Sequence, residues 1–242
     1  MSNPTIISIE GGIGAGKTTI IEHLERMYRN NPYIQFIREP VSIWESIQDS
    51  TGENILQKFY KDTKKFAFTF QVMAFVTRLS TIRTIIKENP ECKVIICERS
   101  LEADRHIFAK MLFDDGLIDE IHYKIYLKFY EEYRADFKLD GIVYINADAE
   151  ICNERIKKRA RGGEESVPID YLRNCQKYHD DWLGNLPEGM VLNIKTNDDV
   201  SYKNDQGIIW LEQIKEFIEN IGSKQDDIFD RLYDSFSKFI AF

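Results

Sequence analysis

The sequence predicts an α/β fold in which a parallel sheet is covered by helices on both faces. Short, continuous apolar runs alternate along the chain with longer segments of helical periodicity. Such runs are typical of parallel strands that are buried on both faces. The first run leads directly into a glycine-rich loop that opens a helix, as in a βα unit. Because the alternation continues without a linker, the 242 residues are expected to form one principal domain.

The glycine-rich loop fits the pattern G-x-x-x-x-G-K-[ST]. An apolar run, Ile6 to Ile9, precedes it, and residues 19–24 continue as a helix. The backbone N–H groups of such a loop turn inward around phosphate oxygens, and the helix N-terminus faces the same anion. The lysine of the pattern reaches the β- and γ-phosphates and the threonine holds Mg²⁺. The predicted phosphate-binding site consists of Gly11, Gly12, Ile13, Gly14, Ala15, Gly16, Lys17, Thr18 and Thr19.

A second strand is predicted over residues 34–38, and Glu39 follows it directly. Pro40 favours an extended backbone at Glu39. In an open parallel sheet, ligands bind in the crevice outside the carboxyl ends of the strands. Glu39 can therefore face the γ-phosphate, although an ordinary exposed glutamate at a strand end has the same local sequence.

Short helical pieces come next, and residues 63–89 then form a long predicted helix that ends before Pro90. The apolar positions of its core-facing side are Phe66, Phe70, Met73, Val76 and Leu79. Gln71 and Arg78 lie two turns apart on one side of this helix. They either reach into a pocket together or face solvent, as isolated polar residues on a helix usually do.

The apolar run from Val94 to Cys97 predicts a buried strand that closes on Glu98. A carboxylate at that point can meet Mg²⁺ directly or through water. Arg99 follows immediately, and burying an acid beside a guanidinium is costly unless a ligand or metal uses both. The next predicted elements are helices over residues 104–114 and 117–135 and a strand over 141–145.

The helix that begins near Ala149 carries a row of basic side chains and is followed by two glycines. Basic groups on a helix can swing onto a transferring phosphoryl group, and glycines permit the closing movement. We therefore expect a helical lid, although the same charges also suit a solvated helix. The basic residues are Arg155, Lys157, Lys158, Arg159 and Arg161.

The remaining predicted elements are a helix over 168–183, a strand over 190–194 and a helix over 207–221. Residues 223–242 carry apolar side chains at helical spacing, which predicts a packed C-terminal helix. The chain is thus expected to divide into a domain over residues 1–221 and an extension over 222–242.

The composition narrows the class of partner. A net charge of −8 offers no broad basic face for nucleic acid, which leaves small molecules. The four cysteines form no C-x-x-C pair and suit free thiols, and the histidines lack metal-site spacing. No apolar stretch is long enough to span a bilayer, and a strand beginning near Thr5 leaves no room for a signal peptide. We expect a cytoplasmic protein without membrane partners.

The ordered motifs resemble those of the deoxyribonucleoside kinase family, closest to its deoxycytidine and deoxyguanosine kinase branch, over roughly residues 4–221. The motifs that carry the resemblance are Ile9-Glu10-Gly11, Glu39-Pro40-Val41 with Trp44, Phe68-Thr69-Phe70-Gln71, Glu98-Arg99-Ser100 with Asp104-Arg105, Arg159-Ala160-Arg161, and Tyr178-His179-Asp180-Asp181-Trp182-Leu183.

The resemblance implies a five-stranded parallel sheet and a homodimer formed through helices of the middle of the chain. It implies that ATP, with Mg²⁺, donates its γ-phosphate to the 5′-hydroxyl of a deoxynucleoside for nucleotide salvage. Glu39 would be the general base, and Arg99 would steady Glu39 and the phosphoryl group. Glu98 would help Thr18 to place the metal.

The resemblance also implies which residues bind the substrates. Tyr60 and Glu164 would bind the sugar 3′-hydroxyl. The nucleobase would be recognised by Gln71, Arg78 and Asp104, with Trp44, Phe70 and Phe108 walling the pocket. The lid would be Arg155, Arg159 and Arg161, and the loop with Asp199 would lie near the donor's base.

The resemblance implies that the guanidinium of Arg78 and the carboxylate of Asp104 meet beside Gln71, and this pair predicts the choice of nucleobase. The pair fills the space that the 5-methyl group of thymine needs, while cytosine or a purine can offer complementary polar edges. A mismatched buried hydrogen-bonding site discriminates more strongly than the steric effect of one methyl group. Deoxycytidine, deoxyadenosine or deoxyguanosine should therefore be preferred over thymidine, and the sequence does not order those three.

Three features depart from the family's pattern. Gly12 replaces a more usual polar residue of the loop, and residues after Ile221 have no counterpart. Gly163 replaces the first of two lid acids, which leaves the contact to the 3′-hydroxyl between Glu164 and Glu165. Counting back from Pro168 favours Glu164.

Two other functions share parts of this pattern. A nucleoside monophosphate kinase such as a thymidylate kinase has the same loop, but its acceptor phosphate would want a cationic clamp where Glu39 stands. A regulatory GTP-binding switch is the second. Residues 49–52 and 181–184 fit D-x-x-G, but neither segment ends a predicted strand and no N-K-x-D follows.

Overall fold

In the computed structural model, five parallel strands form one sheet in the order β2-β3-β1-β4-β5. The structure describes residues 3–159, 167–203 and 205–222. The strands are β1 (Thr5–Glu10), β2 (Ile34–Ile37), β3 (Val94–Glu98), β4 (Gly141–Asn146) and β5 (Val191–Lys195). The predicted α/β fold with a five-stranded parallel sheet is confirmed.

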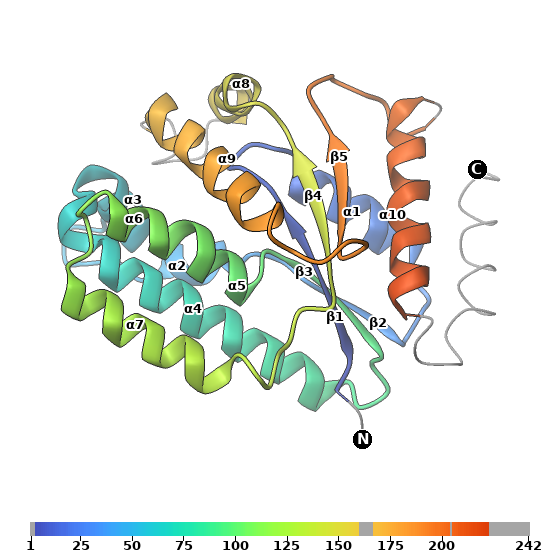
Figure 1. Cartoon of the computed structure of the whole chain (residues 1–242), viewed down its shortest axis with the longest axis horizontal. Helices are drawn as coiled ribbons and strands as arrows, with labels where there is room; N and C mark the ends of the chain where they lie inside the picture. The colour runs from blue at the N-terminus through green and yellow to red at the C-terminus, as the bar shows by residue number, and fades with distance from the viewer. Residues whose placement is uncertain (1–2, 160–166, 204, 223–242) are drawn as a thin grey trace.

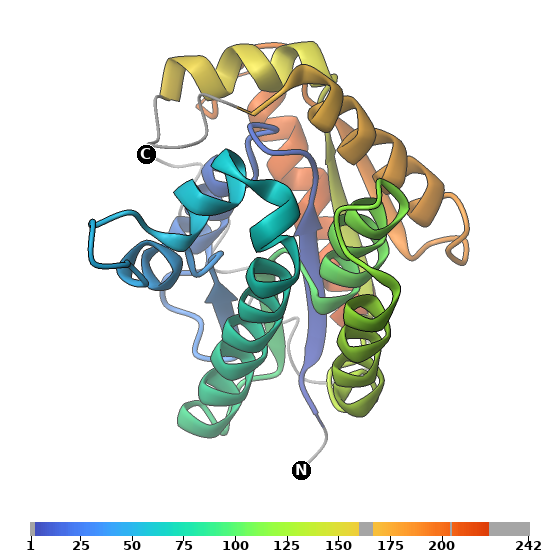
Figure 2. The ribbon, with the colours of Figure 1, turned by 90° about the vertical axis from the view of Figure 1, so that its left-hand side faces the viewer.

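Helices cover both faces of this sheet, as Figures 1 and 2 show. One face is covered by α1 (Lys17–Met27) and α10 (Gln206–Gly222). The elements on or beside the other face are α2 (Val41–Ser46), α3 (Ile55–Lys61), α4 (Thr63–Glu88), α5 (Leu101–Ala103), η1 (Asp104–Ala109), α6 (Lys110–Asp114) and α7 (Glu120–Tyr133). At the end of the sheet toward which the strand arrows point lies α8 (Ala149–Arg159), as Figure 1 shows. From this end α9 (Ile169–Leu183) runs back beside the sheet and packs against η1 and α6.

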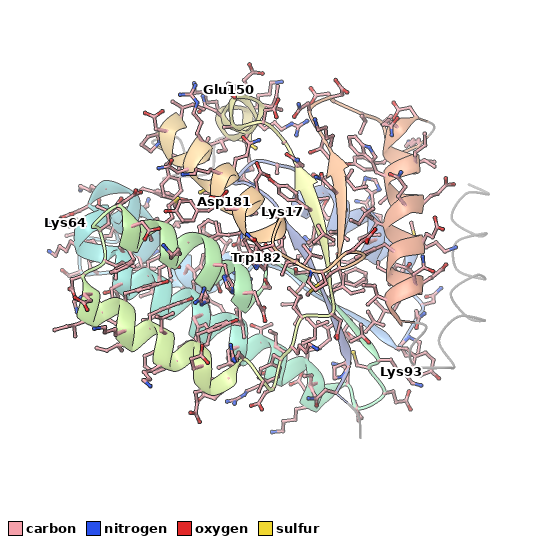
Figure 3. All side chains as sticks on the ribbon, in the orientation of Figure 1. Lys17, Lys64, Lys93, Glu150, Asp181 and Trp182 are labelled. Carbon is pink, nitrogen blue, oxygen red and sulfur yellow. The ribbon has the colours of Figure 1, made fainter. Side chains whose placement is uncertain are left out.

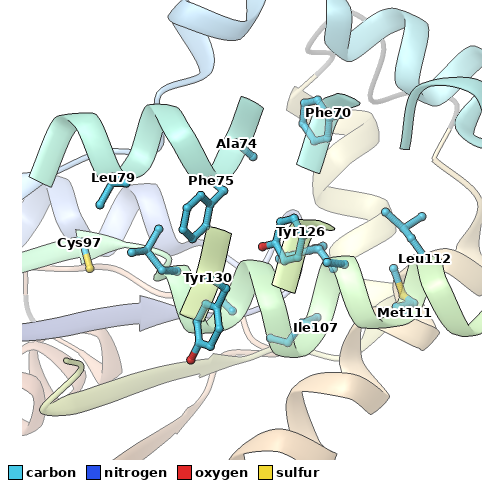
Figure 4. Packing of buried hydrophobic residues seen from close by; sticks show 14 of the residues in the cluster. Phe70, Ala74, Phe75, Leu79, Cys97, Ile107, Met111, Leu112, Tyr126 and Tyr130 are labelled. Atoms are coloured by element: carbon cyan, nitrogen blue, oxygen red, sulfur yellow. The ribbon is translucent and has the colours of Figure 1, made fainter. Parts of the chain in front are cut away.

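The apolar side chains of the strands supply two core layers. Ile6 packs on the side of α4 and α7, whereas Ile7 and Ile9 pack on the side of α1 and α10. In the first layer the rings of Phe75 and Tyr126 meet edge to face with centroids 5.9 Å apart (Figure 4). Burial on both faces explains why the strands have continuous apolar sequences.

The long helix α4 follows its predicted span closely. The side chain of Asp62 accepts a hydrogen bond from the Lys65 N–H and so caps its first turn. Gln71 and Arg78 are buried, which decides for the pocket alternative over the solvent-facing one. The prediction that Val76 belongs to the core is wrong, because this side chain is 47% exposed.

One helix differs in kind from its prediction. Residues 104–114 were expected as a single α-helix, but residues 104–109 form the π-helix η1 between α5 and α6. A π segment has a wider turn and often occurs at functional sites, and hydrophobic periodicity does not distinguish it from an α-helix. None of the helices in the described residues is both long enough and apolar enough to span a membrane.

Candidate active site

A cavity of about 560 Å³ opens at the carboxyl ends of the strands. The strand order reverses around β1, and such a point is where open α/β sheets bind ligands. Predicted site residues that line it are Ile13, Gly14, Ala15, Gly16, Lys17, Thr18, Thr19, Glu39, Trp44, Tyr60, Phe70, Gln71, Arg78, Glu98, Arg99, Asp104, Phe108, Arg155, Arg159 and Asp199. Arg161 and Glu164, also predicted for the site, lie outside the described residues.

The phosphate loop is folded tightly against α8 and β4. Gly14 has a φ of +82°, and a Cβ there would lie 2.6 Å from the Cys152 carbonyl oxygen. At Gly11, where φ is +147°, a Cβ would lie 2.4 Å from the Ile145 carbonyl oxygen. Both positions therefore require glycine, on conformational and on steric grounds.

Lys17 lies in the interior, whereas the labelled Lys64 and Lys93 extend at the periphery (Figure 3). The Nζ atom of Lys17 donates hydrogen bonds to the carbonyl oxygens of Gly11 at 3.2 Å and Gly12 at 2.8 Å. Burial, and after it the positive charge of Arg99, lowers the pKa of Lys17 to about 8. Since desolvation disfavours the isolated cation, an anionic phosphate beside it would be strongly attracted.

Thr18 and Glu98 meet at the mouth of this loop. The Thr18 hydroxyl donates to Glu98 Oε1 at 2.8 Å, which joins the start of α1 to the end of β3. A hydroxyl and a carboxylate are oxygen ligands of the kind that Mg²⁺ accepts together with substrate phosphates and water. The described residues contain no cluster of three His, Cys, Asp or Glu side chains that could hold a metal alone. The pair fits Mg²⁺ that arrives with a nucleotide.

Glu39 and Arg99 form an ion pair across the ends of β2 and β3. Arg99 Nε donates to Glu39 Oε1 at 3.0 Å, and the guanidinium carbon lies 4.6 Å from the centre of the Phe108 ring. Arg99 has a φ of +66°, in the left-handed region that is costly for a residue with a Cβ. Such a strained, buried arginine at a cavity wall is typical of a functional position.

A second ion pair lies deeper in the cavity. Arg78 Nε donates to Asp104 Oδ2 at 2.9 Å, and its Nη1 donates to the Glu98 carbonyl oxygen at 2.7 Å. The Nη2 atom of Arg78 is also 3.7 Å from Glu39 Oε1, so Arg78 and Arg99 both contact the carboxylate of Glu39. The partners Arg78 and Asp104 are 26 positions apart in the sequence, and the π-helix η1 begins at Asp104.

Aromatic rings line the remainder of this end of the cavity. Trp44 donates its indole N–H to Thr77 Oγ1 at 3.0 Å and meets Phe70 edge to face at 5.3 Å. Within the part of the chain described here, Gln71 Oε1 is buried without a hydrogen-bond partner. An apolar slot with a few fixed polar groups is typical of a small-molecule site.

The opposite end of the cavity lies between α8 and the loop after β5. Arg155 donates to the carbonyl oxygens of Ala15 at 3.4 Å and Asp198 at 3.1 Å, and it lies 3.6 Å from an Asp199 carboxylate oxygen. These contacts bring the predicted lid arginine and the predicted donor loop together beside the phosphate loop.

Sequence reasoning missed several residues of this region. Glu10 is fully buried at the end of β1, and Ser100 donates its hydroxyl to Glu10 Oε1 at 2.6 Å. At the donor end, Tyr202 lines the cavity and stacks on His23 with ring centroids 4.3 Å apart. The available signal for Glu10 was an acid that directly continues an apolar strand into the glycine loop.

Comparison with known proteins agrees with this geometry. The profile of the family described as "Deoxynucleoside kinase" matches residues 7–219. A Fowlpox virus (strain NVSL) protein named "Probable deoxycytidine kinase FPV151" is 35% identical over 237 residues, covering 96% of this chain and 88% of the relative. Deoxycytidine kinase 2 of Gallus gallus is 32% identical, covering 88% of this chain and 89% of the relative. Mitochondrial deoxyguanosine kinase of Xenopus laevis is 28% identical, with 93% and 87% covered. The chain therefore belongs to the deoxynucleoside kinase family and is an ATP-dependent nucleoside kinase.

Proposed function

We propose that this enzyme transfers the γ-phosphoryl group of ATP to the 5′-hydroxyl of a deoxynucleoside and produces the monophosphate for salvage. The observation that carries the proposal is the Glu39 carboxylate, held 3.0 Å from Arg99 Nε in the same cavity as the phosphate loop. A carboxylate so placed suits removal of a proton from an alcohol. An acceptor phosphate would instead be repelled by it.

In this reaction the chain's own residues position the reactants and balance charge. Glu39 accepts the proton of the 5′-hydroxyl as its oxygen attacks the γ-phosphorus, and Arg99 holds the carboxylate toward that hydroxyl. Lys17 attracts the β- and γ-phosphates, and Arg155, Arg159 and Arg161 form the lid over them. Positioning and electrostatic stabilisation account for most of the catalysis in phosphoryl transfer. We assign Mg²⁺ to Thr18 and Glu98, where it would neutralise part of the phosphate charge.

The deoxynucleoside is proposed to occupy the aromatic end of the cavity. Trp44, Phe70 and Phe108 wall the nucleobase, and Gln71, Arg78 and Asp104 recognise its polar edge. The buried Gln71 Oε1, which lacks a partner among the described residues, supports this role. Tyr60 and Glu164 bind the 3′-hydroxyl. The loop with Asp199 lies near the base of ATP.

We infer that deoxycytidine, deoxyadenosine or deoxyguanosine is preferred over thymidine, because the Arg78–Asp104 pair fixes both donors and acceptors. Measuring kcat/KM for all four deoxynucleosides tests this, and thymidine as the best substrate would refute it. Changing Arg78→Met and Asp104→Ala together should admit thymidine. Changing one partner alone would leave the other's charge buried and unpaired.

The reaction class is tested separately. Incubation with ATP and a deoxynucleoside should yield the 5′-monophosphate. Phosphorylation of a monophosphate alone would indicate a nucleoside monophosphate kinase, and hydrolysis of GTP without acceptor would indicate a GTP-binding switch. These two outcomes would overturn the proposal.

We further propose a homodimer that forms through the exposed apolar side of α7 and α4. Ile121, Ile125 and Phe129 lie one turn apart and are 72%, 42% and 41% exposed, and Val76 on the adjacent α4 is 47% exposed. Exposed apolar side chains grouped on two packed helices favour association. The proposed kinase domain is residues 1–221 with an extension over 222–242, and the four free cysteines support a cytoplasmic location.

A further inference from the structure

Glu10 is a buried acid that the reaction as described above does not use. It is the last residue of β1, and its side chain is fully buried directly before the phosphate loop. The register of β1 on β3 pairs Ile9 with Glu98, so Glu10 lies beside the turn where β3 continues into Arg99 and Ser100.

One oxygen of the Glu10 carboxylate is fixed by that turn. Ser100 donates its hydroxyl to Glu10 Oε1 at 2.6 Å, and Ser100 Oγ accepts the Ala103 N–H at 3.0 Å as the N-cap of α5. Glu10 Oε2 and Arg99 Nη1 are both buried and have no hydrogen-bond partner in the part of the chain that the structure describes. The hydrogen bond to Ser100 therefore holds the carboxylate in place, and within the described ranges no cation contacts it directly.

The positive charge that acts most strongly on this carboxylate is that of Arg99. Burial raises the pKa of Glu10, and among the groups that oppose this rise Arg99 acts most strongly, followed by the Ser100 hydrogen bond and Arg78. On Arg99, in turn, the two attractive carboxylates that act most strongly are Glu39 and then Glu10. Arg99 thus lies in the field of two carboxylates, one in the cavity and one beneath it.

The two carboxylates differ in what happens to them during the proposed reaction. Glu39 becomes neutral when it takes the proton of the 5′-hydroxyl, and at that moment Arg99 loses the negative charge of the carboxylate to which it donates a hydrogen bond. A buried guanidinium without a counter-charge is strongly destabilised. A carboxylate that receives no proton from the substrate can keep the arginine in place through the transfer.

We propose that Glu10 is a positioning residue that acts through Arg99: its carboxylate is the counter-charge that remains with Arg99 while Glu39 accepts and releases the substrate proton. The inference rests on the proposed roles of Glu39 and Arg99. It assigns to the acid before the phosphate loop a task in the chemical step, in addition to its hydrogen bond with the N-cap of α5.

A double-mutant cycle separates this role from a structural one. The four enzymes are the native chain, Glu10→Gln, Arg99→Met and the double variant, and kcat is measured in single turnovers where chemistry limits. Glutamine keeps the size of the side chain and an oxygen for the Ser100 hydroxyl but removes the charge. In the native background Glu10→Gln should lower kcat by roughly 10-fold or more, since interacting residues couple by amounts of that order. In the Arg99→Met background the same change should cost less than about 2-fold.

Nucleoside binding and a control variant complete the test. The deoxynucleoside KM of Glu10→Gln should stay within about 3-fold of native, because the charge acts on the chemical step and not on ground-state binding. The matched control is Glu102→Gln, which also removes an acid whose pKa burial raises, to about 7, and on which the leading charges are Glu10, Asp104 and Asp140. Its kcat should be native.

Each other outcome is decisive. An equal loss of kcat in both backgrounds, or no loss in either, would overturn the role of Glu10. If Arg99→Met itself left kcat unchanged, the proposed role of Arg99 would fail first. Should Glu10→Gln not fold, Ser100→Ala replaces it in the same cycle. The loss of the hydroxyl that fixes the carboxylate should then lower kcat only when Arg99 is present, and an equal loss without Arg99 would count against the proposal.

Discussion

His179 shows how a single buried side chain links stability to pH. It is fully buried in α9, with its Nδ1 2.6 Å from the Cys175 carbonyl oxygen and its ring stacked on Tyr144. Burial, and after it the charge of Arg99, lowers the pKa of His179 to about 3. In the unfolded chain a histidine titrates near pH ~6.5, so between these values the unfolded state binds more protons than the folded one.

This difference predicts acid destabilisation in a defined window. The contribution of neutral His179 to the free energy of unfolding is complete above about pH 6.5 and is lost progressively toward pH 3. His179→Leu should therefore lose less stability between pH 7 and pH 5 than the native chain. Urea unfolding at both values measures this, with the exposed His122→Gln as control. Equal losses in native protein and His179→Leu would contradict the prediction.

Some residues of the site could be predicted from the sequence because their immediate sequence neighbours identify them. Lys17 and Thr18 belong to a contiguous motif, and Glu39 and Glu98 are acids that directly follow apolar strands. The Arg78–Asp104 pair joins α4 to η1 and was expected only through the resemblance. Glu10 was missed as a functional group although it, too, directly continues an apolar strand. The burial of His179 was missed because no local pattern distinguishes a buried imidazole from an exposed one.

The phosphate loop packs closely against the helix α8 at Gly14. Gly14 and Gly52 have nearly the same φ, +82° and +81°, but a Cβ at Gly14 would meet the Cys152 carbonyl oxygen and Ile156, whereas a Cβ at Gly52 would meet open space. Gly14→Ala should push the loop and α8 apart and weaken ATP binding by at least about 10-fold, with nucleoside binding retained. Gly52→Ala carries the same backbone strain without the clash.

Calorimetric titration of both variants with ATP and with the nucleoside measures this difference. We expect only Gly14→Ala to lose affinity for ATP, which would show that the donor site depends on the close packing of the loop against α8. Equal ATP affinity in the two variants would show that the steric contact at Gly14 has no consequence for the donor site.

Element types were predicted more reliably than their internal geometry. The strands and the long helices α4, α9 and α10 lie within a few residues of their predicted spans, because hydrophobic periodicity and proline reflect them directly. The π-helix η1 and the left-handed backbone at Arg99 have no such signal in the sequence. Both lie at contacts between elements around the cavity, with Arg78 on Asp104 and Glu39 on Arg99.

The exposed apolar side of α7 is the proposed contact between two copies of the chain. If Ile125 is buried between two copies of the chain, Ile125→Glu places a charge in that interface and should convert the dimer to a monomer. Ile43→Glu is the control, since Ile43 is as exposed as Ile125, at 43% against 42%, but lies on α2. Sedimentation velocity over a range of concentrations distinguishes the species. A native chain that stays monomeric, or an Ile125→Glu variant that stays dimeric, would contradict the proposed interface.

The proposed reaction depends most directly on one carboxylate of the cavity, that of Glu39, as general base. Glu39→Gln keeps the shape and a hydrogen-bonding oxygen for Arg99 but cannot accept a proton. General-base contributions are typically ~10²–10⁴-fold, so single-turnover kcat for a deoxynucleoside should fall by that order while the nucleoside dissociation constant stays nearly native. A Glu39→Gln enzyme with near-native kcat, measured where the chemical step limits, would contradict the account.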